Sequence, residues 1–269
     1  MGIVNVTPDS FYDGGRYSRI EQAVAHALDL VEQGVDILDI GGESTRPGAS
    51  PIDEETELGH VIPVVDELAR RTTVPLSIDT TKAEVARRGL DCGASIINDV
   101  SALRGDPAMA SVIAQYGAGV VLMHMQGTPQ TMQQNPQYED VVQQVHQFLS
   151  DRVRCAMEAG IPQSHIILDP GFGFGKLVSH NLELLRQLSS LSTLGRPLLV
   201  GLSRKGFIGE LVGRPVQQRA WGTAAAVALA VERGAKIIRV HDVEMMMDVV
   251  TFTAALDPYW VTETQEHDA

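Results

Sequence analysis

Three hydrogen-bond acceptors stand where short apolar runs of the sequence come to an end. They are the side chains of Asp79, Asn98 and Asp169. Carboxylate and amide oxygens in such places suit a planar heterocycle that carries several N–H donors, such as an aminopyrimidinone ring. These three residues are therefore candidates for binding a polar ring.

A second set of side chains at the ends of such runs carries positive charge or can acquire it. The set consists of Arg46, Arg204, Lys205, Arg239 and His241. Guanidinium and ammonium donors match the oxygens of a phosphate group. The two sets together predict a ligand with a polar ring at one end and a phosphate at the other.

The apolar runs themselves are typical of buried parallel strands. They are continuous rather than alternating, as expected for strands that are covered on both faces. The expected strands span Gly2–Thr7, Val35–Gly41, Pro75–Thr80, Ser95–Val100, Gly119–Met125, His165–Pro170, Pro197–Ser203 and Lys236–His241.

Segments with the apolar period of a helix separate these runs. They span Ile20–Gln33, Asp53–Arg71, Lys82–Asp91, Pro107–Tyr116, Glu139–Ala159, Asn181–Leu191, Pro215–Arg233 and Val243–Leu256. Eight strands that alternate with eight helices over 269 residues predict an α/β fold, a (β/α)₈ barrel that forms one domain over residues 1–269. A doubly wound open sheet is the alternative, but it requires a Gly-rich phosphate loop after the first strand, and the sequence has none there.

In a (β/α)₈ barrel the chemistry takes place at the carboxyl ends of the strands. Each of the eight runs delivers a polar or ionisable group at that end. A charged group next to an apolar strand costs several kcal/mol unless it is paired or serves a ligand. This face is therefore the predicted site, and the loops after the last two strands are the usual phosphate site of the fold.

The composition excludes several classes of protein. The chain has 34 acidic and 21 basic residues, a net charge of -13, and no run rich in Lys or Arg, which argues against nucleic acid and anionic membranes as partners. No basic-then-apolar signal opens the sequence, and no apolar run approaches the ~18 residues of a membrane span. Cys92 and Cys155 are too few for a disulfide scaffold. We expect a compact cytoplasmic protein with reduced thiols.

Two further patterns are weaker than they look. The stretch Gly171-Phe172-Gly173-Phe174-Gly175-Lys176 resembles a phosphate loop, but Pro170 and Leu177 break the required spacing, so a loop of close backbone approach is expected. No two histidines have the spacing of a zinc site, and the end of the first strand, Asn5-Val6-Thr7, lacks the His-x-His of metal-dependent hydrolase barrels.

Taken in order, the strand ends resemble those of the dihydropteroate synthases. The matching motifs are Asn5-Val6-Thr7-Pro8-Asp9-Ser10-Phe11, Gly41-Gly42-Glu43-Ser44-Thr45-Arg46-Pro47-Gly48, Ile78-Asp79-Thr80, Ile97-Asn98-Asp99, Met123-His124-Met125-Gln126-Gly127, Leu168-Asp169-Pro170-Gly171-Phe172-Gly173-Phe174, Ser203-Arg204-Lys205 and Arg239-Val240-His241-Asp242. The resemblance runs from residue 2 to about the end of the last helix, and the ordered set is far more specific than any single motif.

The resemblance implies a transferase of folate biosynthesis. Such an enzyme joins 6-hydroxymethyl-7,8-dihydropterin diphosphate to p-aminobenzoate and releases diphosphate, with ionisation to a pterin cation before the amine attacks. It implies Mg²⁺ as a cofactor, sulfonamides as inhibitors and a homodimer through the later helices. Positioning and electrostatics should dominate the chemistry, because the arylamine is neutral near pH 7 and needs no strong base.

The resemblance also implies residue roles by motif position. The pterin would be held by Asp79, Asn98, Met123, Asp169 and Lys205, and p-aminobenzoate or a sulfonamide by Phe11, Thr45, Arg46, Pro47, Ser203 and Lys205. The diphosphate would be held by Asn5, Thr45, Arg46, Arg239 and His241, with Asn5 as a ligand of Mg²⁺. The catalytic candidates are Asp79, Lys205, Arg239 and His241.

Other features carry further expectations. The segments Pro8–Gly15 and Glu43–Pro51 fit the mobile lids of the family, and Tyr12 stands where a small polar residue is commoner. Homologues carry a segment before the first strand, so the start at Met1-Gly2 predicts an open barrel floor or a shortened chain.

Two rival functions are open from the sequence. Methyltetrahydrofolate-dependent methyltransferase domains share the barrel and the ring-binding acids, but they need no diphosphate site. A pterin-binding module without activity is the rival from another class, and it would be expected to lose some strand-end groups.

Overall fold

The computed structural model describes residues 1–6 and 16–256. The expected lid at Pro8–Gly15 lies outside these residues, and so do Phe11 and Tyr12.

One sheet of eight parallel strands runs in chain order. The strands are β1 (Gly2–Asn5), β2 (Leu38–Gly41), β3 (Leu76–Asp79), β4 (Ile96–Asp99), β5 (Gly119–Met123), β6 (Ile166–Asp169), β7 (Leu198–Gly201) and β8 (Ala235–Arg239). The sheet closes on itself, because Ile3 N–H donates to the Val240 carbonyl (3.0 Å) and Val240 N–H donates to the Met1 carbonyl (3.0 Å). The predicted barrel is confirmed, and all eight strands are shorter than expected.

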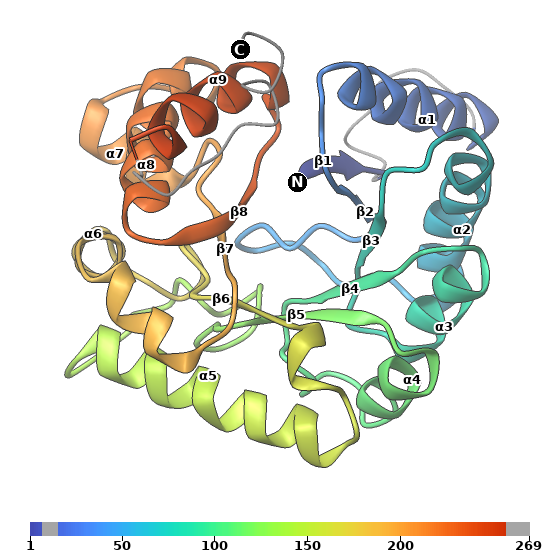
Figure 1. Ribbon diagram of the computed structural model, residues 1–269, viewed down its shortest axis with the longest axis horizontal. Helices are drawn as coiled ribbons and strands as arrows, with labels where there is room; N and C mark the ends of the chain where they lie inside the picture. Colours follow the sequence, from blue (N-terminus) through green and yellow to red (C-terminus); the bar gives the residue numbers. More distant parts are fainter. Residues whose placement is uncertain (7–15, 257–269) are drawn as a thin grey trace, which may run out of the picture.

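Helices surround the ring of strands (Figure 1). In the described residues they are α1 (Arg16–Glu32), α2 (Glu54–Arg71), α3 (Ala83–Asp91), α4 (Met109–Tyr116), α5 (Val141–Glu158), α6 (Val178–Arg186), α7 (Gly206–Val212), α8 (Ala220–Glu232) and α9 (Val243–Ala254). Side-chain caps set two of the starts, since Asp53 accepts from Thr56 N–H (2.7 Å) and Asp140 from Val142 N–H (3.0 Å). None of these helices has both the length and the apolar character that crossing a membrane requires.

Side chains alternate along each strand between the helix-covered face and the barrel interior. On β2, Leu38 and Ile40 pack in the main core under the helices, and Asp39 between them has the opposite direction. Met1, Val121 and Leu199 form a separate buried cluster inside the ring. The barrel interior is therefore apolar toward the amino ends of the strands and becomes polar toward their carboxyl ends.

The segment after β7 differs from the sequence expectation. One helix over Pro215–Arg233 was expected, but two α-helices are present, α7 and α8, with a short 3₁₀ turn at Val216–Gln218. The expectation failed because α7 contains Gly206 and Gly209, which have low helix propensity. The backbone at Gly209 lies close to the Arg219 side chain instead, since a Cβ there would lie 2.1 Å from Nε of Arg219.

The sixth expected helix is also interrupted. It was expected over Asn181–Leu191, but α6 ends at Arg186 and a 3₁₀ helix follows over Leu188–Leu194. Leu188 and Leu191 are buried in this 3₁₀ segment, so the apolar spacing that suggested one α-helix serves two elements.

Candidate active site

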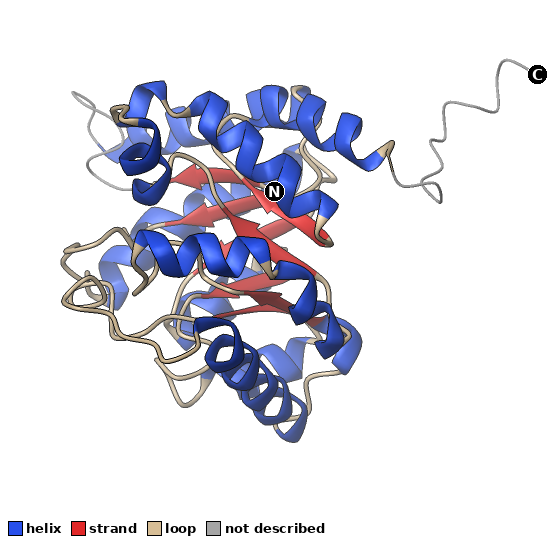
Figure 2. Cartoon of the chain, turned by 90° about the vertical axis from the view of Figure 1, so that its left-hand side faces the viewer, coloured by secondary structure: helices blue, strands red, loops and turns tan. Residues whose placement is uncertain are grey.

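The carboxyl ends of the strands line a cavity of about 1100 Å³. Figure 2 shows the strands pointing toward the side of the molecule where long loops gather. The cavity wall includes Asn5, Thr45, Arg46, Pro47, Asp79, Asn98, Met123, Asp169, Ser203, Lys205, Arg239 and His241. Every site residue predicted from the sequence thus lines this cavity, apart from Phe11, which lies outside the described residues.

A buried carboxylate that the sequence reasoning did not select lies at the centre of the barrel. Asp39 is fully buried and accepts hydrogen bonds from Ser77 Oγ (2.6 Å), Asn98 Nδ2 (3.0 Å) and Arg239 Nε (2.6 Å). These donors come from β3, β4 and β8, so Asp39 joins three strands. Its signal in the sequence was an acid between Leu38 and Ile40, near the end of the expected strand Val35–Gly41, but Asp39 was not among the predicted site residues.

Arg239 links Asp39 to Asp79. Its Nη2 donates to Asp79 Oδ2 at 2.8 Å. Burial disfavours the charged guanidinium, but Asp39 and Asp79 outweigh it and raise the pKa of Arg239. The cation predicted to hold diphosphate is therefore held between two carboxylates at the edge of the ring-binding set.

Asp79 is poised between its charged and neutral forms. Burial raises the pKa of its carboxyl to about 7, with Arg239 opposing the shift and Asp39 adding to it. Small changes beside Asp79, such as the arrival of ligand N–H donors, can therefore change its ionisation near neutral pH.

The ring-binding side of the cavity combines an apolar wall with polar groups. Met123 packs with Val100, Met125 and Met132, and Phe174 lies against this cluster. On the polar side, Asp169 accepts from Gly171 N–H through Oδ1 (2.7 Å). Flat apolar surface next to buried acceptors is what a planar heterocycle with N–H donors requires.

Lys205 reaches the same region from the amino end of α7. Its Nζ lies 4.1 Å from the centroid of the Phe174 ring, a cation–π contact. Burial lowers the pKa of Lys205 to about 8, with Asp169 opposing the shift. Lys205 is thus a hydrogen-bond donor that loses its proton more readily than an exposed lysine does, and the acceptor Asp169 on β6 is close to it.

Ser203 and His241 form a hydrogen-bonded pair across β7 and β8. The backbone N–H of His241 donates to Ser203 Oγ (3.3 Å), and Ser203 Oγ lies 2.9 Å from the ring atom Nδ1 of His241. Burial lowers the pKa of His241 to about 4, and Arg204 and Arg239 reinforce that shift. The imidazole is neutral here, and a donation from Ser203 to Nδ1 leaves the proton on Nε2, facing away from the serine.

The loop between β2 and α2 is held at two points. Gly48 N–H donates to the Pro129 carbonyl (3.0 Å) on the loop after β5. At the other end, the Lys82 ammonium bridges Glu43 and the buried Glu57. Thr45, Arg46 and Pro47 lie between these two anchors, so the anchors set how this segment faces the cavity.

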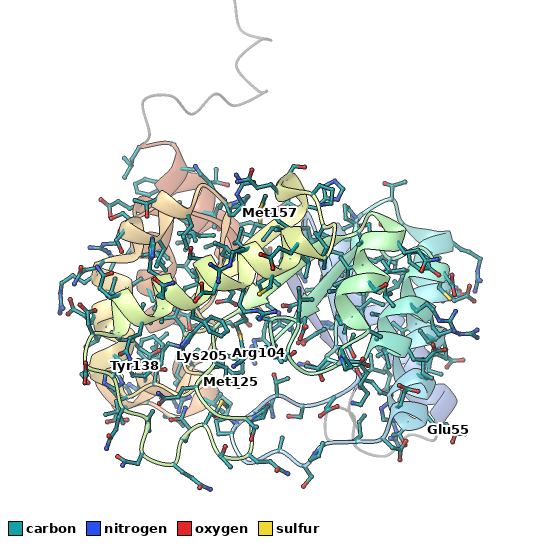
Figure 3. All side chains as sticks on the ribbon, turned by 90° about the horizontal axis from the view of Figure 1, so that it is seen from below. Glu55, Arg104, Met125, Tyr138, Met157 and Lys205 are labelled. Carbon is teal, nitrogen blue, oxygen red and sulfur yellow. The ribbon has the colours of Figure 1, made fainter. Side chains whose placement is uncertain are left out.

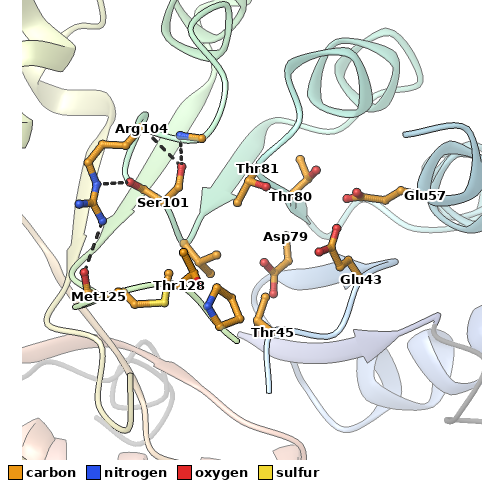
Figure 4. A pocket seen from close by; sticks show the side chains of 14 residues that line it. Glu43, Thr45, Glu57, Asp79, Thr80, Thr81, Ser101, Arg104, Met125 and Thr128 are labelled. Carbon is orange, nitrogen blue, oxygen red and sulfur yellow. Dashed lines mark hydrogen bonds between the residues drawn. The ribbon is translucent and has the colours of Figure 1, made fainter. Parts of the chain in front are cut away.

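A smaller cavity of about 350 Å³ adjoins the main one and shares Glu43, Thr45 and Asp79 with it. Figure 4 shows Asp79, Glu43 and Glu57 on one side and Arg104 on the other. Arg104 donates to the carbonyls of Ser101 (2.9 Å) and Met125 (3.4 Å).

Comparisons with known proteins show which family this chain resembles. A family model described as pterin binding enzyme matches residues 1–241. A dihydropteroate synthase from Synechocystis is 46% identical over 257 residues, which is 95% of this chain and 89% of that protein.

Solved structures of dihydropteroate synthases are also similar to this chain. A Xanthomonas albilineans dihydropteroate synthase with 4-aminobenzoic acid is 51% identical, with a TM-score of 0.90 over 96% of this chain and 92% of that one. A Yersinia pestis dihydropteroate synthase in a sulfonamide drug complex is 45% identical, with a TM-score of 0.90 over 95% and 93% of the two chains.

Proposed function

The chain belongs to the pterin-binding enzyme family, and we propose that its cavity performs the dihydropteroate synthase reaction. The enzyme condenses 6-hydroxymethyl-7,8-dihydropterin diphosphate with p-aminobenzoate to give 7,8-dihydropteroate and diphosphate. The observation that carries this proposal is that one cavity holds both the acceptors Asp79, Asn98 and Asp169 and the basic side chains Arg46, Arg204, Lys205 and Arg239, with neutral His241 beside them. A substrate with a ring at one end and a diphosphate at the other fits that pairing.

The ring end of the substrate lies among Asp79, Asn98, Met123, Asp169 and Lys205. The carboxylates of Asp79 and Asp169 accept from ring N–H groups, and the Lys205 ammonium donates to ring acceptors. Met123 packs on the face of the ring. Asp39 fixes the Asn98 amide by accepting from its Nδ2, which leaves the amide oxygen for the ligand.

The reaction breaks the bond between the pterin methylene carbon and the diphosphate oxygen, whose electron pair leaves with the diphosphate. A new bond forms between that carbon and the amine nitrogen of p-aminobenzoate, and the amine then loses a proton to diphosphate or water. Asp79 and Asp169 stabilise the positive charge that develops on the pterin, while Arg239 and His241 face the leaving group. Thr45, Arg46, Pro47 and Ser203 border the p-aminobenzoate side.

Mg²⁺ fits the donor set at the diphosphate end. The described residues contain no cluster of three or more His, Cys, Asp or Glu side chains that could hold a metal alone. Asn5 lines the cavity with one amide oxygen, and Mg²⁺ commonly takes one or two protein ligands together with phosphate oxygens and water. When bound, the ion neutralises charge on the departing diphosphate.

A turnover assay tests the function. Purified protein is given the pterin diphosphate, p-aminobenzoate and Mg²⁺, and each is omitted in turn while diphosphate release is measured. Release should require all three, and a sulfonamide should compete with p-aminobenzoate for the Ser203 side of the cavity. Pterin binding without diphosphate release would instead indicate a binding module, and methyl transfer from methyltetrahydrofolate would indicate the methyltransferase alternative.

We also propose that two copies of the chain form a homodimer through α7, α8 and α9. Large apolar side chains are exposed on these helices, namely Leu211, Val212, Trp221, Leu229, Met245 and Phe252. Trp221 is 81% exposed and Phe252 is 73% exposed. Apolar surface of this kind is typical of a contact between proteins, and a second copy of the chain is the partner that supplies a matching apolar face.

A further inference from the structure

The Gly-rich stretch that follows β6 ends in a buried lysine. Lys176 is only 3% exposed. Its Nζ lies 2.9 Å from the Gly171 carbonyl oxygen, 3.0 Å from that of Phe174, 2.9 Å from Nδ1 of His124 and 3.4 Å from the His124 carbonyl oxygen. The ammonium therefore occupies a cage of backbone carbonyls and one imidazole nitrogen, and it does not serve as a phosphate ligand.

This cage joins two loops that touch closely. Gly171 has φ +68°, and a Cβ there would lie 1.9 Å from the His124 carbonyl oxygen. Gly175 has φ +60°, and a Cβ there would lie 2.5 Å from the Gln126 carbonyl oxygen. The loop after β6 thus lies directly on the end of β5, and Lys176 donates to both loops at the point of contact.

The loop that Lys176 holds carries part of the pterin site. Asp169 is tied to its start through the Gly171 N–H. Phe174 provides the ring beneath the Lys205 ammonium, and Gly173 lets the Lys205 side chain pass, since a Cβ there would lie 3.1 Å from Lys205 Cδ. A shift of this loop would move both Asp169 and Lys205 relative to a bound ring.

Burying the positive charge of Lys176 at this position costs free energy. Burial lowers its pKa to about 7, with the charge of Asp169 opposing that shift and Lys205 adding to it. Its field nevertheless reaches Asp169, where burial raises the pKa of the carboxyl while Lys205 and Lys176 oppose that shift. A methionine would fill a similar volume without the cost of burying a cation, so packing alone does not account for a lysine.

We propose that Lys176 is a positioning residue for pterin recognition. Its ammonium fixes the Gly171–Phe174 turn against His124, so that Asp169 and Lys205 hold the geometry that the pterin ring requires. It acts through these residues and through the loop, without touching the substrate. This inference rests on the proposed synthase function.

The test compares Lys176→Met with a matched control, Lys236→Met, at an exposed lysine on β8. KM for each substrate, kcat, and the Kd of free pterin by fluorescence are measured after circular dichroism has verified folding. Lys176→Met should raise the pterin Kd and the KM for the pterin diphosphate about tenfold, as expected for the loss of interactions that position the ring. The KM for p-aminobenzoate should stay within about twofold, and Lys236→Met should match the wild type.

A second variant covers the case in which Lys176→Met does not fold. Tyr138 Oη donates to the Gly175 carbonyl (2.8 Å) from the outer side of the same loop, and Tyr138 and Lys205 lie on the loop-bearing side of the barrel (Figure 3). Tyr138→Phe should raise the pterin Kd about threefold and leave the KM for p-aminobenzoate unchanged.

An unchanged pterin Kd in a folded Lys176→Met protein would overturn the inference, and so would equal changes in both KM values. If Lys176→Met does not fold, an unchanged pterin Kd in Tyr138→Phe has the same consequence. A wild-type protein that fails to turn over refutes the synthase function itself, whereas a fully active wild type beside an unaffected variant refutes only the role of Lys176.

Discussion

At the scale of single residues, Asp79 is the group whose ionisation should control substrate capture. Its pKa is raised to about 7, and protonation replaces one acceptor position of the carboxylate with an O–H donor. As the pH falls through 7 the group becomes protonated, so kcat/KM for the pterin diphosphate should drop about tenfold between the plateau and pH 6. A pH–rate profile from pH 5.5 to about 9 measures this.

Asp79→Asn provides the control for that profile. The amide cannot titrate, so kcat/KM should be low at all pH values and the decline between about pH 8 and 6 should disappear. An acid limb of the same midpoint in Asp79→Asn would assign the titration to another group.

The residues that sequence reasoning found and missed differ in where their partners come from. Asp79, Asn98 and Asp169 were predictable because a barrel brings all carboxyl ends of its strands to one face. Asp39 was missed because its partners lie on β3, β4 and β8. Lys176 was missed because three of its four hydrogen-bond partners are backbone carbonyls, which leave no trace in residue types.

At the scale of elements, strands were easier to predict than the helices after β6 and β7. Strand positions follow from apolar runs bounded by polar residues, and all eight were recovered. The short α7 could not be found this way, because Gly206 and Gly209 lower its helix propensity. Gly222 on α8 permits a close contact with α7, which is visible only in three dimensions. A Cβ at Gly222 would lie 2.6 Å from Ile208 Cγ2.

The loop between β2 and α2 yields a second prediction. Lys82→Met removes the cation that joins Glu43 to Glu57, so the base of the loop that carries Thr45 and Arg46 is released. The KM for p-aminobenzoate should rise about fivefold, while the KM for the pterin diphosphate stays within about twofold. Steady-state kinetics with each substrate varied in turn measure both values.

A double variant separates loop positioning from loss of stability. Lys82→Met leaves Glu57 buried without its cation, which should lower the free energy of unfolding by about 3 kcal/mol. Adding Glu57→Gln removes the buried charge, so stability in urea should recover while the KM for p-aminobenzoate stays raised. Recovery of both quantities together would mean that Lys82 serves stability alone.

At the scale of the whole molecule, the exposed apolar face on α7, α8 and α9 predicts the state of assembly. Trp221→Glu places a charge on that face and should convert the proposed dimer to a monomer, because an unpaired charge cannot be buried in an apolar contact. Sedimentation velocity at micromolar protein measures the mass.

Met157→Glu is the matched control, since Met157 is 46% exposed on α5, away from the proposed contact. It should sediment as the wild type does. A wild-type monomer, or a Trp221→Glu protein that remains a dimer, would remove this face as the contact surface.

The closure of the barrel has a consequence for the order in which the protein acquires activity. Asp39 and Arg239 are 200 positions apart in the chain, and joining ends so distant costs roughly 5 kcal/mol of chain entropy on a logarithmic loop-length scale. The pairing of β8 with β1 provides the interactions that offset this entropy. The arrangement of Asp39, Asp79 and Arg239 is therefore absent from any partly folded chain in which β8 is still free. With Arg239 acting as proposed, we therefore expect activity to appear only at the end of folding: a chain with most of its helices and strands formed should be inactive until the last strand docks.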